Sequence, residues 1–468
     1  MISGPPRFAT IASLAVSGCA VGPDFVPPEP VAPVDFAVQA EALKIAEPEV
    51  EWWATFEDPL LDRLIGDAVT ANHDLRIAAS NVLLARSLLG EGGFDRWPTV
   101  TASGGVIRQQ QSEAVSAAGF ADPVTVWDGG FDASWELDFF GRVRRSIEAL
   151  AGDYNAAVAD RRDAFVIVTA EVARNYIELR GAQYRLQVAH ENARNQQQTF
   201  QLTEALLAGG RGTNLDIARA QSQFESTLAS IPPLEAAVRR AIHRLGVLTG
   251  VPPGSLYRDL EAARPLPPLP ETVSIGDPAA LLRRRPDIAA AEFQLAAATA
   301  RIGVATADLF PRVTVIGAAG YTAIDESDFG RSSTERFSIG PFLSWAAFDL
   351  GRVRARISAA EAATDAGLAI YERTVLLALE ETDNALINFT RSRQRLEHLR
   401  VSAGAGGTAA ELARLRYRNG VDSFLSVLDA ERRVLELQDL LASGEMEAAQ
   451  NLVAVYKALG GAWQYQAE

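Results

Sequence analysis

The chain has little with which to build a reactive or metal-binding site. It has one cysteine among 468 residues, so no intramolecular disulfide can form, and its four histidines are dispersed without metal-ligand spacing. No G-x-S-x-G turn and no Walker-type glycine loop occurs. Basic residues are outnumbered, 44 against 59 acidic ones, and the formal net charge of −15 argues against nucleic acid as a partner. We therefore expect neither an enzyme nor a cofactor or metal site.

Long hydrophobic runs are missing as well. No stretch after Cys19 offers a run of about 18 uncharged apolar residues, so we expect no transmembrane helix, and a membrane crossing would need a closed β-barrel. The short run FATIASLAV before VSGC suits a signal peptide. Small residues before a cysteine resemble a bacterial lipoprotein cleavage box, so we predict a signal peptide over 1–18 and acylation of Cys19. The alternative is an ordinary cysteine in a leader.

Proline is absent from 124–231 and from every position after Pro341. This allows two very long helices, one after Gly141 and one after Gly351, and the first would extend about 65 residues, or about 100 Å at 1.5 Å per residue. We expect the chain to turn at Gly210 and Gly420 and to return as helices to about 248 and about 459. The glycines expected to interrupt the second long helix are Gly404, Gly406 and Gly407.

One phrase of the sequence occurs twice. SWELDFFGRVR at 134–144 recurs as SWAAFDLGRVR at 344–354, a shift of 210, and GRGTNLDIARAQ from Gly210 aligns at the same shift with GVDSFLSVLDAE from Gly420. Upstream the shift is 213, where Pro98 meets Pro311. Colinear matches with one small gap indicate a tandem duplication.

Each copy predicts a helix, a strand, a polar loop, a second strand and a long helical hairpin. The first helices are expected from Pro59 to about Leu89 and from Pro278 to about Asp308, and the first strands over Thr99–Ile107 and Arg312–Tyr321. The expected domains are the two copies at 59–250 and 278–460, an extended N-terminal segment at 19–58, a proline-rich connector at 251–277 and a tail at 461–468.

The segment FDASWELDF at 131–139 alternates apolar and polar residues, which places two kinds of side chain on opposite faces of a strand. In a soluble sheet these faces would be core and solvent; in a membrane barrel they would be lipid and lumen. On the second interpretation the lumen acids are Asp132, Glu136 and Asp138. The lipid-facing aromatic residues are then Phe131, Trp135, Phe139 and, in the second copy, Trp345.

Four strands cannot close a membrane barrel, because the smallest barrels have eight, and open strand edges in lipid leave backbone groups without partners. Several chains must therefore share one barrel, and a trimer would supply twelve strands in a ring with nearly sixfold repetition. A lumen lined by carboxylates would favour cations. We expect a mixed α+β membrane protein of this kind.

Several segments resemble one family. LLRRRPDIAAAEFQLAAATARIGVATADLFP at 281–311, CAVGPDFVPP from Cys19, WWATFEDPLLDRLI from Trp52 and YRNGVDSFLSVLDAERRVLELQ from Tyr417 are similar to the TolC-like outer-membrane efflux proteins, in their lipoprotein (OprM/NodT-like) branch. The resemblance implies a homotrimer with a twelve-stranded barrel on a periplasmic α-helical barrel, surrounded by an equatorial belt to which 19–58 and 251–277 would contribute.

The same resemblance implies an aperture at the periplasmic helical tips. Asp429 would line it, and Ser426 stands where relatives often have a second acid. Asp216 and Tyr417 occupy positions that in relatives help to hold the tips closed. The usual basic partner is replaced by Asp422, and its role could pass to either of two nearby arginines, Arg416 and Arg418.

The function implied is a passive exit duct for small molecules in a tripartite efflux pump, lipid-anchored in the bacterial outer membrane. Its partners would be a periplasmic adaptor and an inner-membrane transporter of the RND type. One alternative keeps this fold but exports polypeptides in a type I secretion system. A second alternative, from another class, is a lipid-anchored periplasmic coiled-coil scaffold without a pore.

Overall fold

The protein is described by a computed structural model covering residues 20–29, 33, 35–38, 40–110, 112, 123–461 and 464. The predicted signal peptide and Cys19 lie outside these residues. The chain divides into two compact units, which we describe separately. The first comprises Met1–Pro28, Leu83–Ala156 and Glu292–Ile370, and the second Glu29–Val82, Ala157–Ala291 and Tyr371–Glu468.

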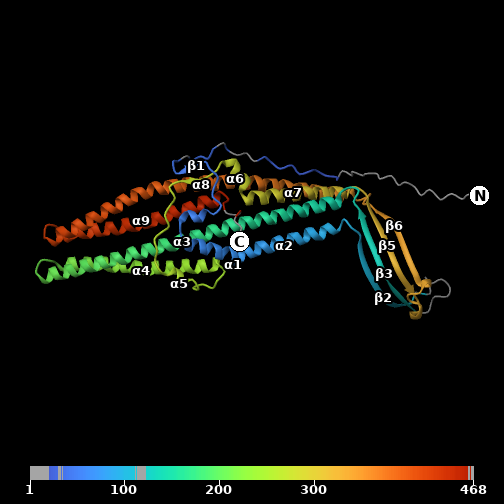
Figure 1. Ribbon diagram of the computed structural model, residues 1–468, viewed down its shortest axis with the longest axis horizontal. Helices are drawn as coiled ribbons and strands as arrows, with labels where there is room; N and C mark the ends of the chain where they lie inside the picture. The colour runs from blue at the N-terminus through green and yellow to red at the C-terminus, as the bar shows by residue number, and fades with distance from the viewer. Residues whose placement is uncertain are drawn as a thin grey trace, which may run out of the picture. The chain divides into compact units, whose positions relative to one another are not determined.

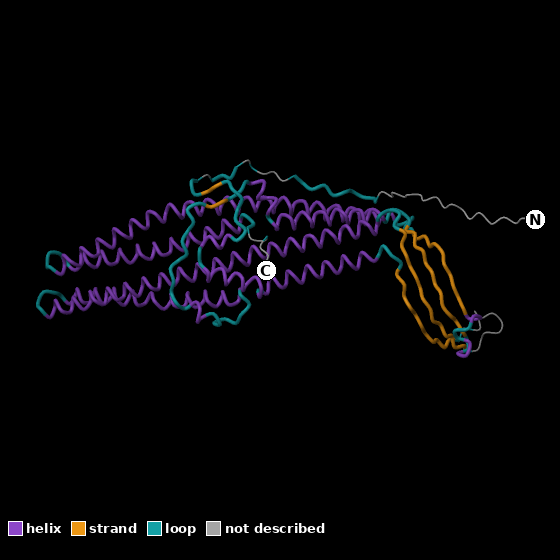
Figure 2. Tube along the Cα trace, viewed as in Figure 1, coloured by secondary structure: helices purple, strands orange, loops and turns teal. Residues whose placement is uncertain are grey.

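The first unit contains one four-stranded antiparallel sheet, whose strands lie side by side in Figure 2. Its strands, in the order in which they neighbour one another, are β2 (Thr99–Gln109), β3 (Val124–Leu137), β5 (Arg312–Ala323) and β6 (Glu335–Ser344). The predicted first strands are confirmed and extend two residues further. The central pair, β3 and β5, joins the first copy of the repeat to the second.

Two residues predicted on the second strand lie beyond its end. β3 stops at Leu137, and Asp138 instead accepts hydrogen bonds from the backbone N–H groups of Val143 and Arg144, at 3.1 and 3.0 Å. The first N–H groups of a helix have no partner within the helix, so a carboxylate placed here stabilises its start. Asp138 is therefore a helix cap, not a lumen acid, and Phe139 follows in the turn. Trp345 likewise follows the end of β6.

The helix predicted at the start of each copy is two helices. The first copy has α1 (Pro59–Ala71) and α2 (His73–Phe94), because the Asn72 side chain accepts hydrogen bonds from the backbone N–H groups of Asp74 and Leu75 and so starts a new helix. The second copy has α6 (Pro278–Arg284) and α7 (Pro286–Ala307), because the residue before a proline favours extended backbone. The offset of 213 is retained between α2 and α7.

α7 departs from the expectation that no helix could cross a membrane. Among the described residues it alone passes a test of length and hydropathy, with half of its apolar window buried in the protein. It carries Glu292 and Arg301, and Arg301 makes an ion pair with Asp153 of α3 at 2.5 Å. These charges and this burial identify α7 as a packed core helix.

The long helices are as predicted. α3 (Arg142–Ala208) has 67 residues and α8 (Leu350–Arg418) has 69; each turns and returns as a helix of 35 residues, α4 (Asn214–Leu248) and α9 (Phe424–Ala458) (Figure 1). The predicted interruption at Gly404, Gly406 and Gly407 is wrong. A Cβ at Gly406 would lie 2.8 Å from a methyl carbon of Leu437, so this glycine allows α8 and α9 to pack closely. Prolines 232 and 233 lie inside α4.

The core of the second unit is aromatic and aliphatic. Trp52 and Phe56, from the short helix η1 (Trp52–Phe56), are buried, and Trp52 stacks on Tyr456 of α9 at 5.1 Å between ring centroids. The two proline-rich segments meet in the parallel pair β1 (Leu43–Lys44) and β4 (Val273–Ser274), and the connector also holds the short helix α5 (Tyr257–Leu260). The extended segments on either side of β1 and β4 thus pack against the helices of the second unit.

Candidate functional site

The sheet has two chemically different faces. Directly opposed residues of an antiparallel pair lie on the same face, so the register assigns every side chain. One face is formed by small and apolar residues over most of its length, namely Val100, Ala102, Gly104 and Val106 of β2, Phe131, Ala133, Trp135 and Leu137 of β3, Val313, Val315, Gly317 and Ala319 of β5, and Phe337, Ile339, Pro341 and Leu343 of β6. The alternation predicted on one strand therefore holds across all four.

Within the described part of the chain this apolar face is uncovered except at its loop end, where Phe329 packs against Gly129 and Tyr321. Phe337 is 84 % exposed and Ile339 is 76 % exposed, values typical of unfolded or lipid-facing side chains and costly in water. The opposite face carries Ser103, Asp132, Glu136, Thr314 and Ser338, with Ile107, Ile316 and Phe342 as apolar interruptions. A sheet with one exposed apolar face and one polar face is suited to a boundary between lipid and water.

Two tryptophans hold the strand ends at equivalent points of the two copies. The Nε1–H of Trp135 donates to the carbonyl oxygen of Arg96, and that of Trp345 donates to the carbonyl oxygen of Leu309, both at 3.0 Å. All the predicted lipid-facing aromatic residues are exposed: Phe131, Trp135, Phe139 and Trp345. The two tryptophans thus present a ring to the surroundings while the polar edge is bonded to protein.

The acids on the polar face differ in how they are neutralised. Glu136 accepts two hydrogen bonds from the guanidinium group of Arg142, at 2.8 and 2.6 Å, and lies 3.7 Å from Arg312. Asp132 is exposed and accepts a hydrogen bond from Ser103 at 3.1 Å. Of the three predicted lumen acids, Asp132 is therefore the one that remains on the polar face without an arginine.

Sequence reasoning missed the arginines that offset these acids. On the same face Asp128 of β3 pairs with Arg336 of β6 at 2.9 Å and accepts a hydrogen bond from Thr322 of β5 at 2.7 Å. The partners stand about 200 positions apart in the sequence, so only the strand order brings them together. A face that looks acidic along one strand is closer to neutral across the sheet.

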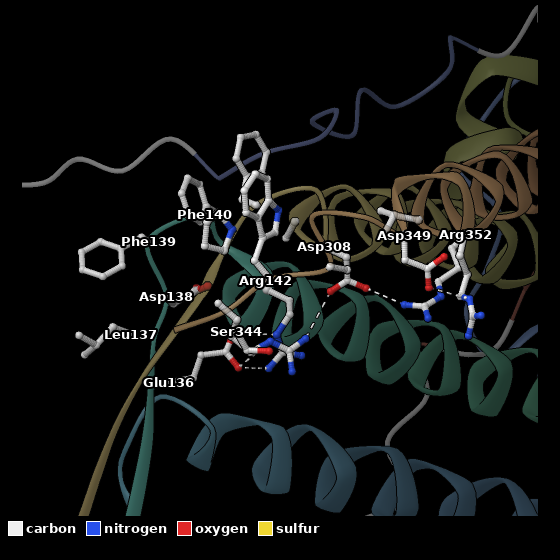
Figure 3. A pocket seen from close by; sticks show the side chains of 18 residues that line it. Glu136, Leu137, Asp138, Phe139, Phe140, Arg142, Asp308, Ser344, Asp349 and Arg352 are labelled. Carbon is white, nitrogen blue, oxygen red and sulfur yellow. Dashed lines mark hydrogen bonds and ion pairs between the residues drawn. The ribbon is translucent and has the colours of Figure 1, made fainter. Parts of the chain in front are cut away.

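A small charged cavity of about 250 Å³ lies where the strands lead into the long helices (Figure 3). Asp308 accepts from Arg356 at 3.1 Å and from Arg312 at 3.3 Å, while Arg352 pairs with Asp349 at 3.0 Å. Each of these acids is thus matched by a base. This arrangement favours a structural joint over a reactive centre, because no acid here stands apart from an arginine to act on a substrate.

In the second unit, the turn of the first helical hairpin is closed by a capping box. Gly210 has φ +73°, the left-handed conformation that glycine adopts readily. The backbone N–H of Asp216 donates to the Thr213 hydroxyl at 3.2 Å, and the Thr213 backbone N–H donates back to the Asp216 carboxylate at 3.2 Å. Asp216, predicted at the closing contacts of the tips, thus has a local role at the start of α4.

The second hairpin turns at Gly420 with different side-chain bonds. Asp422 accepts hydrogen bonds from the Ser426 hydroxyl at 2.9 Å and from the Arg416 guanidinium at 3.3 Å. Arg416, one of the two arginines considered as a replacement partner, is therefore paired within its own hairpin. Asp429 is exposed on α9. Of the predicted tip residues, Ser426 thus touches the turn and Asp429 faces outward.

Tyr417 packs inside the second hairpin. Its ring lies 5.5 Å from that of Phe424, in a cluster that includes Ala220 of the first hairpin's return helix. Burial, and next the negative charge of Asp216, raise the pKa of the Tyr417 hydroxyl. Asp216 of the first hairpin is thus near enough to the Tyr417 hydroxyl of the second for its charge to act on it.

A buried ion pair near the tips escaped the sequence analysis. Glu431 of α9 is 3 % exposed and accepts hydrogen bonds from the Thr199 hydroxyl of α3 at 2.7 Å and from the Arg414 guanidinium of α8 at 2.6 Å. The sequence repeat does single out this position, because Glu431 is acidic where the first copy has the neutral Gln221. Glu431 ties three helices together.

A second charged cluster lies where the start of α7 and the end of α9 meet the middle of α8. Arg285 donates to Asp287 and to Glu381, each at 2.8 Å, and Lys457 donates to Glu381 at 3.0 Å. Burial, and next the charge of Asp287, raise the pKa of the nearby Asp163 carboxyl to about 6. Among the described residues no group of histidine, cysteine and acidic side chains could hold a metal ion, and this cluster contains its own cations.

Comparison with known proteins gives consistent matches over nearly the whole chain. The family described as outer membrane efflux protein matches residues 64–251 and 278–461. Nodulation protein T of Rhizobium leguminosarum bv. trifolii is 30 % identical over 452 residues, 96 % of each protein. The solvent efflux pump outer membrane protein SrpC of Pseudomonas putida is 30 % identical over 467 residues, 98 % of each.

A solved structure agrees in fold. The outer-membrane channel OprN superposes with a TM-score of 0.90 and 42 % identity, covering 96 % of this chain and all of that one. Such proteins are channels, not enzymes. The exposed apolar face, the paired charges and the long hairpins are thus those of an outer-membrane channel that extends into the periplasm, and this chain belongs to the outer membrane efflux protein family.

Proposed function

We propose that this efflux channel is a trimer in which each subunit contributes four strands to one twelve-stranded barrel. The observation that carries the proposal is the sheet β2-β3-β5-β6, which has one exposed apolar face, one polar face and two open edges. Four strands are too few to close a barrel, and open edges in lipid leave backbone groups unpaired. Three copies of a duplicated unit would close the ring with nearly sixfold repetition.

In this assembly the apolar face contacts lipid and the polar face lines the lumen. Phe131 and Trp135 stand on the lipid side of β3, and Phe139 and Trp345 follow strand ends, where aromatic side chains of membrane barrels gather. Asp132 is the lumen acid that acts on passing ions, since Glu136 is already paired with an arginine.

At the periplasmic tips, we assign Asp429 to the lining of the aperture, with Ser426 beside it, and Asp216 and Tyr417 to the contacts that hold the tips closed. The exposure of Asp429, and the contribution of the Asp216 charge to the raised pKa of Tyr417, support this assignment. Exposed ion pairs contribute about 0–1 kcal/mol each, so a closed state held by a few of them is readily shifted by a docking partner.

The duct is passive, so energy comes from its partners, a periplasmic adaptor and an inner-membrane transporter of the RND type. SrpC is named for solvent efflux, and we extend the class of small molecules to this chain. Polypeptide export with a type I secretion system is the alternative with the same fold. A lipid-anchored coiled-coil scaffold without a pore is the alternative of another class, and the exposed apolar sheet face disfavours it.

The N-terminal anchor is a separate part of the proposal. Cys19 follows a short apolar run and small residues, a pattern that predicts acylation. Cys19→Ser should abolish incorporation of a labelled fatty acid and release part of the protein from the membrane fraction. Labelling of the variant equal to that of the parent chain would refute the acylation of Cys19.

The channel itself is tested by two measurements on one detergent-purified sample. Native mass should give three chains, and the same sample in a planar lipid bilayer should show small, cation-selective conductance. Export of a labelled small molecule rather than of a polypeptide, in cells that depend on this channel, separates the two alternatives that share the fold. A monomer without conductance would favour the alternative hypothesis of a lipid-anchored scaffold without a pore.

A further inference from the structure

The segment 20–24 is held at the turn where β3 leads into α3. The backbone N–H of Val21 donates to the carbonyl oxygen of Phe140 at 3.1 Å. Gly141 is buried with φ +82°, and a Cβ built on it would lie 2.6 Å from the Cβ of Ala20. Glycine is required at this position, because the contact leaves no room for a side chain and the backbone conformation disfavours one. The segment therefore packs directly on the turn.

A second close contact joins the segment to another helix of the first unit. Gly22 has φ +90°, and a Cβ on it would lie 2.5 Å from the Cα of Gly303 in α7. Gly303 is buried, and a Cβ there would in turn lie 2.7 Å from the Cγ of Arg145 in α3. The segment thus lies against both α3 and α7, and each approach depends on a glycine.

Arg145 supplies the polar contacts of this site, and we name it, together with Gly141 and Gly303, the Arg145 cradle. The Arg145 side chain is only 5 % exposed. Its guanidinium donates to the carbonyl oxygens of Val21 and Gly22, at 3.2 and 3.3 Å, and to the carboxylate of Asp24 at 2.7 Å. A fourth hydrogen bond goes to Glu148 at 2.8 Å. A cation removed from water needs partners, and the segment supplies three of the four.

The duplication supplies an internal comparison for the cradle. The counterparts of Arg145, Gly141 and Gly303 are Ala355, Gly351 and Gly90. All three are exposed, and a Cβ on either glycine would meet no neighbouring atom within 4 Å. In the described part of the chain the second copy thus has neither the cation nor a docked segment. The arginine occurs only in the copy that receives the segment, which favours recognition of the segment as the role of Arg145.

The cradle lies at the end of the apolar sheet face. Phe139 and Phe140 follow β3, and the ring of Phe140 stacks on that of Phe310 with 4.5 Å between the centroids. Phe139 and Phe310 are both exposed. Exposed aromatic rings at the end of an apolar band are typical of the boundary between lipid and water. The residue before Ala20 in the sequence is Cys19, for which acylation is predicted.

We propose that the Arg145 cradle is a docking site that recognises the segment 20–24 through its backbone and Asp24, without any contribution from an acyl group. The anchor of Cys19 is thereby attached to the body of the protein at the end of the apolar sheet face, and not through a free tether. The attachment of the anchor rests on the acylation proposed above. The docking itself rests neither on acylation nor on a trimer, because all of its contacts lie within one chain.

Hydrogen exchange at the Val21 amide reports docking, because this N–H is bonded to the protein only while the segment is in the cradle. In the purified full-length protein it should exchange at least about a hundredfold more slowly than in a free peptide of the same sequence. Arg145→Met keeps an apolar side chain of similar length and removes two bonds to backbone carbonyls. Since each bond contributes roughly a factor of five, exchange should become at least about tenfold faster. The matched control, Ala355→Met, should leave the rate unchanged.

A second variant changes the segment and leaves the helices as they are. Gly22→Ala would set a methyl group against Gly303 and force a residue with a side chain to adopt φ +90°, so it should release the segment to a similar extent. Val26→Ala, just beyond the segment at an exposed position, is its control and should leave the exchange of Val21 as it is. The unfolding temperature of each variant checks that the helices remain folded.

Cys19→Ser separates the docking from the anchor. The slow exchange of Val21 should persist in this variant, because the contacts of the cradle begin at Ala20. Fast exchange in Cys19→Ser would mean that the acyl group holds the segment, which overturns recognition by the cradle. Fast exchange in the parent protein, or slow exchange retained in both Arg145→Met and Gly22→Ala, would overturn the docking site. A native mass of one chain would contradict the trimer while leaving these exchange results valid.

Discussion

The helical hairpin of the first copy turns at Gly210 and that of the second at Gly420, with φ values of +73° and +71° and return helices of 35 residues each. Their side-chain bonds are different. The first turn is closed by the capping box of Thr213 and Asp216, whereas at the second Ser423 makes no capping bond and Asp422 accepts from Arg416 and Ser426 instead. The duplication preserved the backbone path and allowed the polar contacts to diverge.

The divergence is larger further from the turns. Glu431 is buried among three helices while its counterpart Gln221 is exposed, and Asp163 is largely desolvated while its counterpart Arg373 is exposed. A charged residue that is buried in one copy therefore has, at the matched position of the other copy, an exposed residue of different charge. Comparing substitutions at matched positions can therefore separate what the repeated backbone requires from what one copy has added.

The largest difference is expected at Glu431. Glu431→Ala leaves the partly buried Arg414 without its partner and should lower the free energy of unfolding by about 3 kcal/mol, the low end of the cost of breaking a buried pair. Gln221→Ala, at the matched exposed position, should change it by less than about 0.5 kcal/mol. Thermal or denaturant unfolding in detergent measures both. Equal losses of unfolding free energy in the two variants would show that Glu431 contributes no more to stability than Gln221 does.

The next effect is at Asp163 and depends on pH. Because its folded pKa of about 6 lies above its unfolded value, the protonated form stabilises the fold at low pH, and this stability is lost as pH rises from about 4 through about 6. Asp163→Asn should therefore stabilise the protein by about 2–3 kcal/mol at pH 7 and remove that pH-dependent loss.

The matched control for Asp163 is Arg373→Ala, which should leave the dependence of the unfolding temperature on pH as it is. Unfolding temperatures across pH 4–8 give both results. A parent protein whose stability does not fall between pH 4 and 6 would contradict the burial cost assigned to Asp163.

A smaller effect is expected at the turns. Thr213→Ala removes the capping box and should cost about 1 kcal/mol, whereas Ser423→Ala should cost a few tenths, about 0.3 kcal/mol, because Ser423 makes no capping bond. Hydrogen exchange of the first turn of α4 and of α9 compares the two locally. Faster exchange in both helices to the same extent would mean that the two turns are alike.

The smallest effect on stability is expected at Asp429, where the substitution should instead change the conductance of the channel. Its counterpart is Arg219, so a ring of six tips would alternate acid and base. Asp429→Ala should raise single-channel conductance or lower its sensitivity to divalent cations, while changing the unfolding free energy by less than about 0.5 kcal/mol. Arg219→Ala is the matched variant and should shift selectivity toward cations. If neither quantity changed with Asp429→Ala, Asp429 would lie outside the aperture.

The repeat and the absence of proline made the long elements predictable. A missing proline over more than a hundred residues allowed α3, and its recurrence at a fixed offset allowed α8. The strand alternation predicted a two-faced sheet, and the register extends the two faces to all strands. These features depend on the spacing of apolar residues, prolines and repeated segments, which can be seen in the sequence itself.

What could not be predicted depends on single side-chain bonds. The helix starts at Asn72 and after Asp138 arise from carboxylate or amide oxygens that accept backbone N–H groups, and such a residue looks the same in sequence whether it caps or faces solvent. The partners of Glu136 and Asp128 come from other strands. Sequence alone predicts a helix break at Gly406, because it does not distinguish a glycine that allows two helices to pack closely from one that ends a helix.

The prolines at 232 and 233 have a counterpart that is not proline. Where α4 has Pro232 and Pro233, α9 has Ala442 and Ser443, and a proline inside a helix removes a backbone donor and bends the helix locally. A ring of three subunits would therefore offer a surrounding protein six helical hairpins of two alternating curvatures. A partner that binds only one of the two hairpin shapes would saturate at three copies per ring. A partner that binds both shapes would reach six copies.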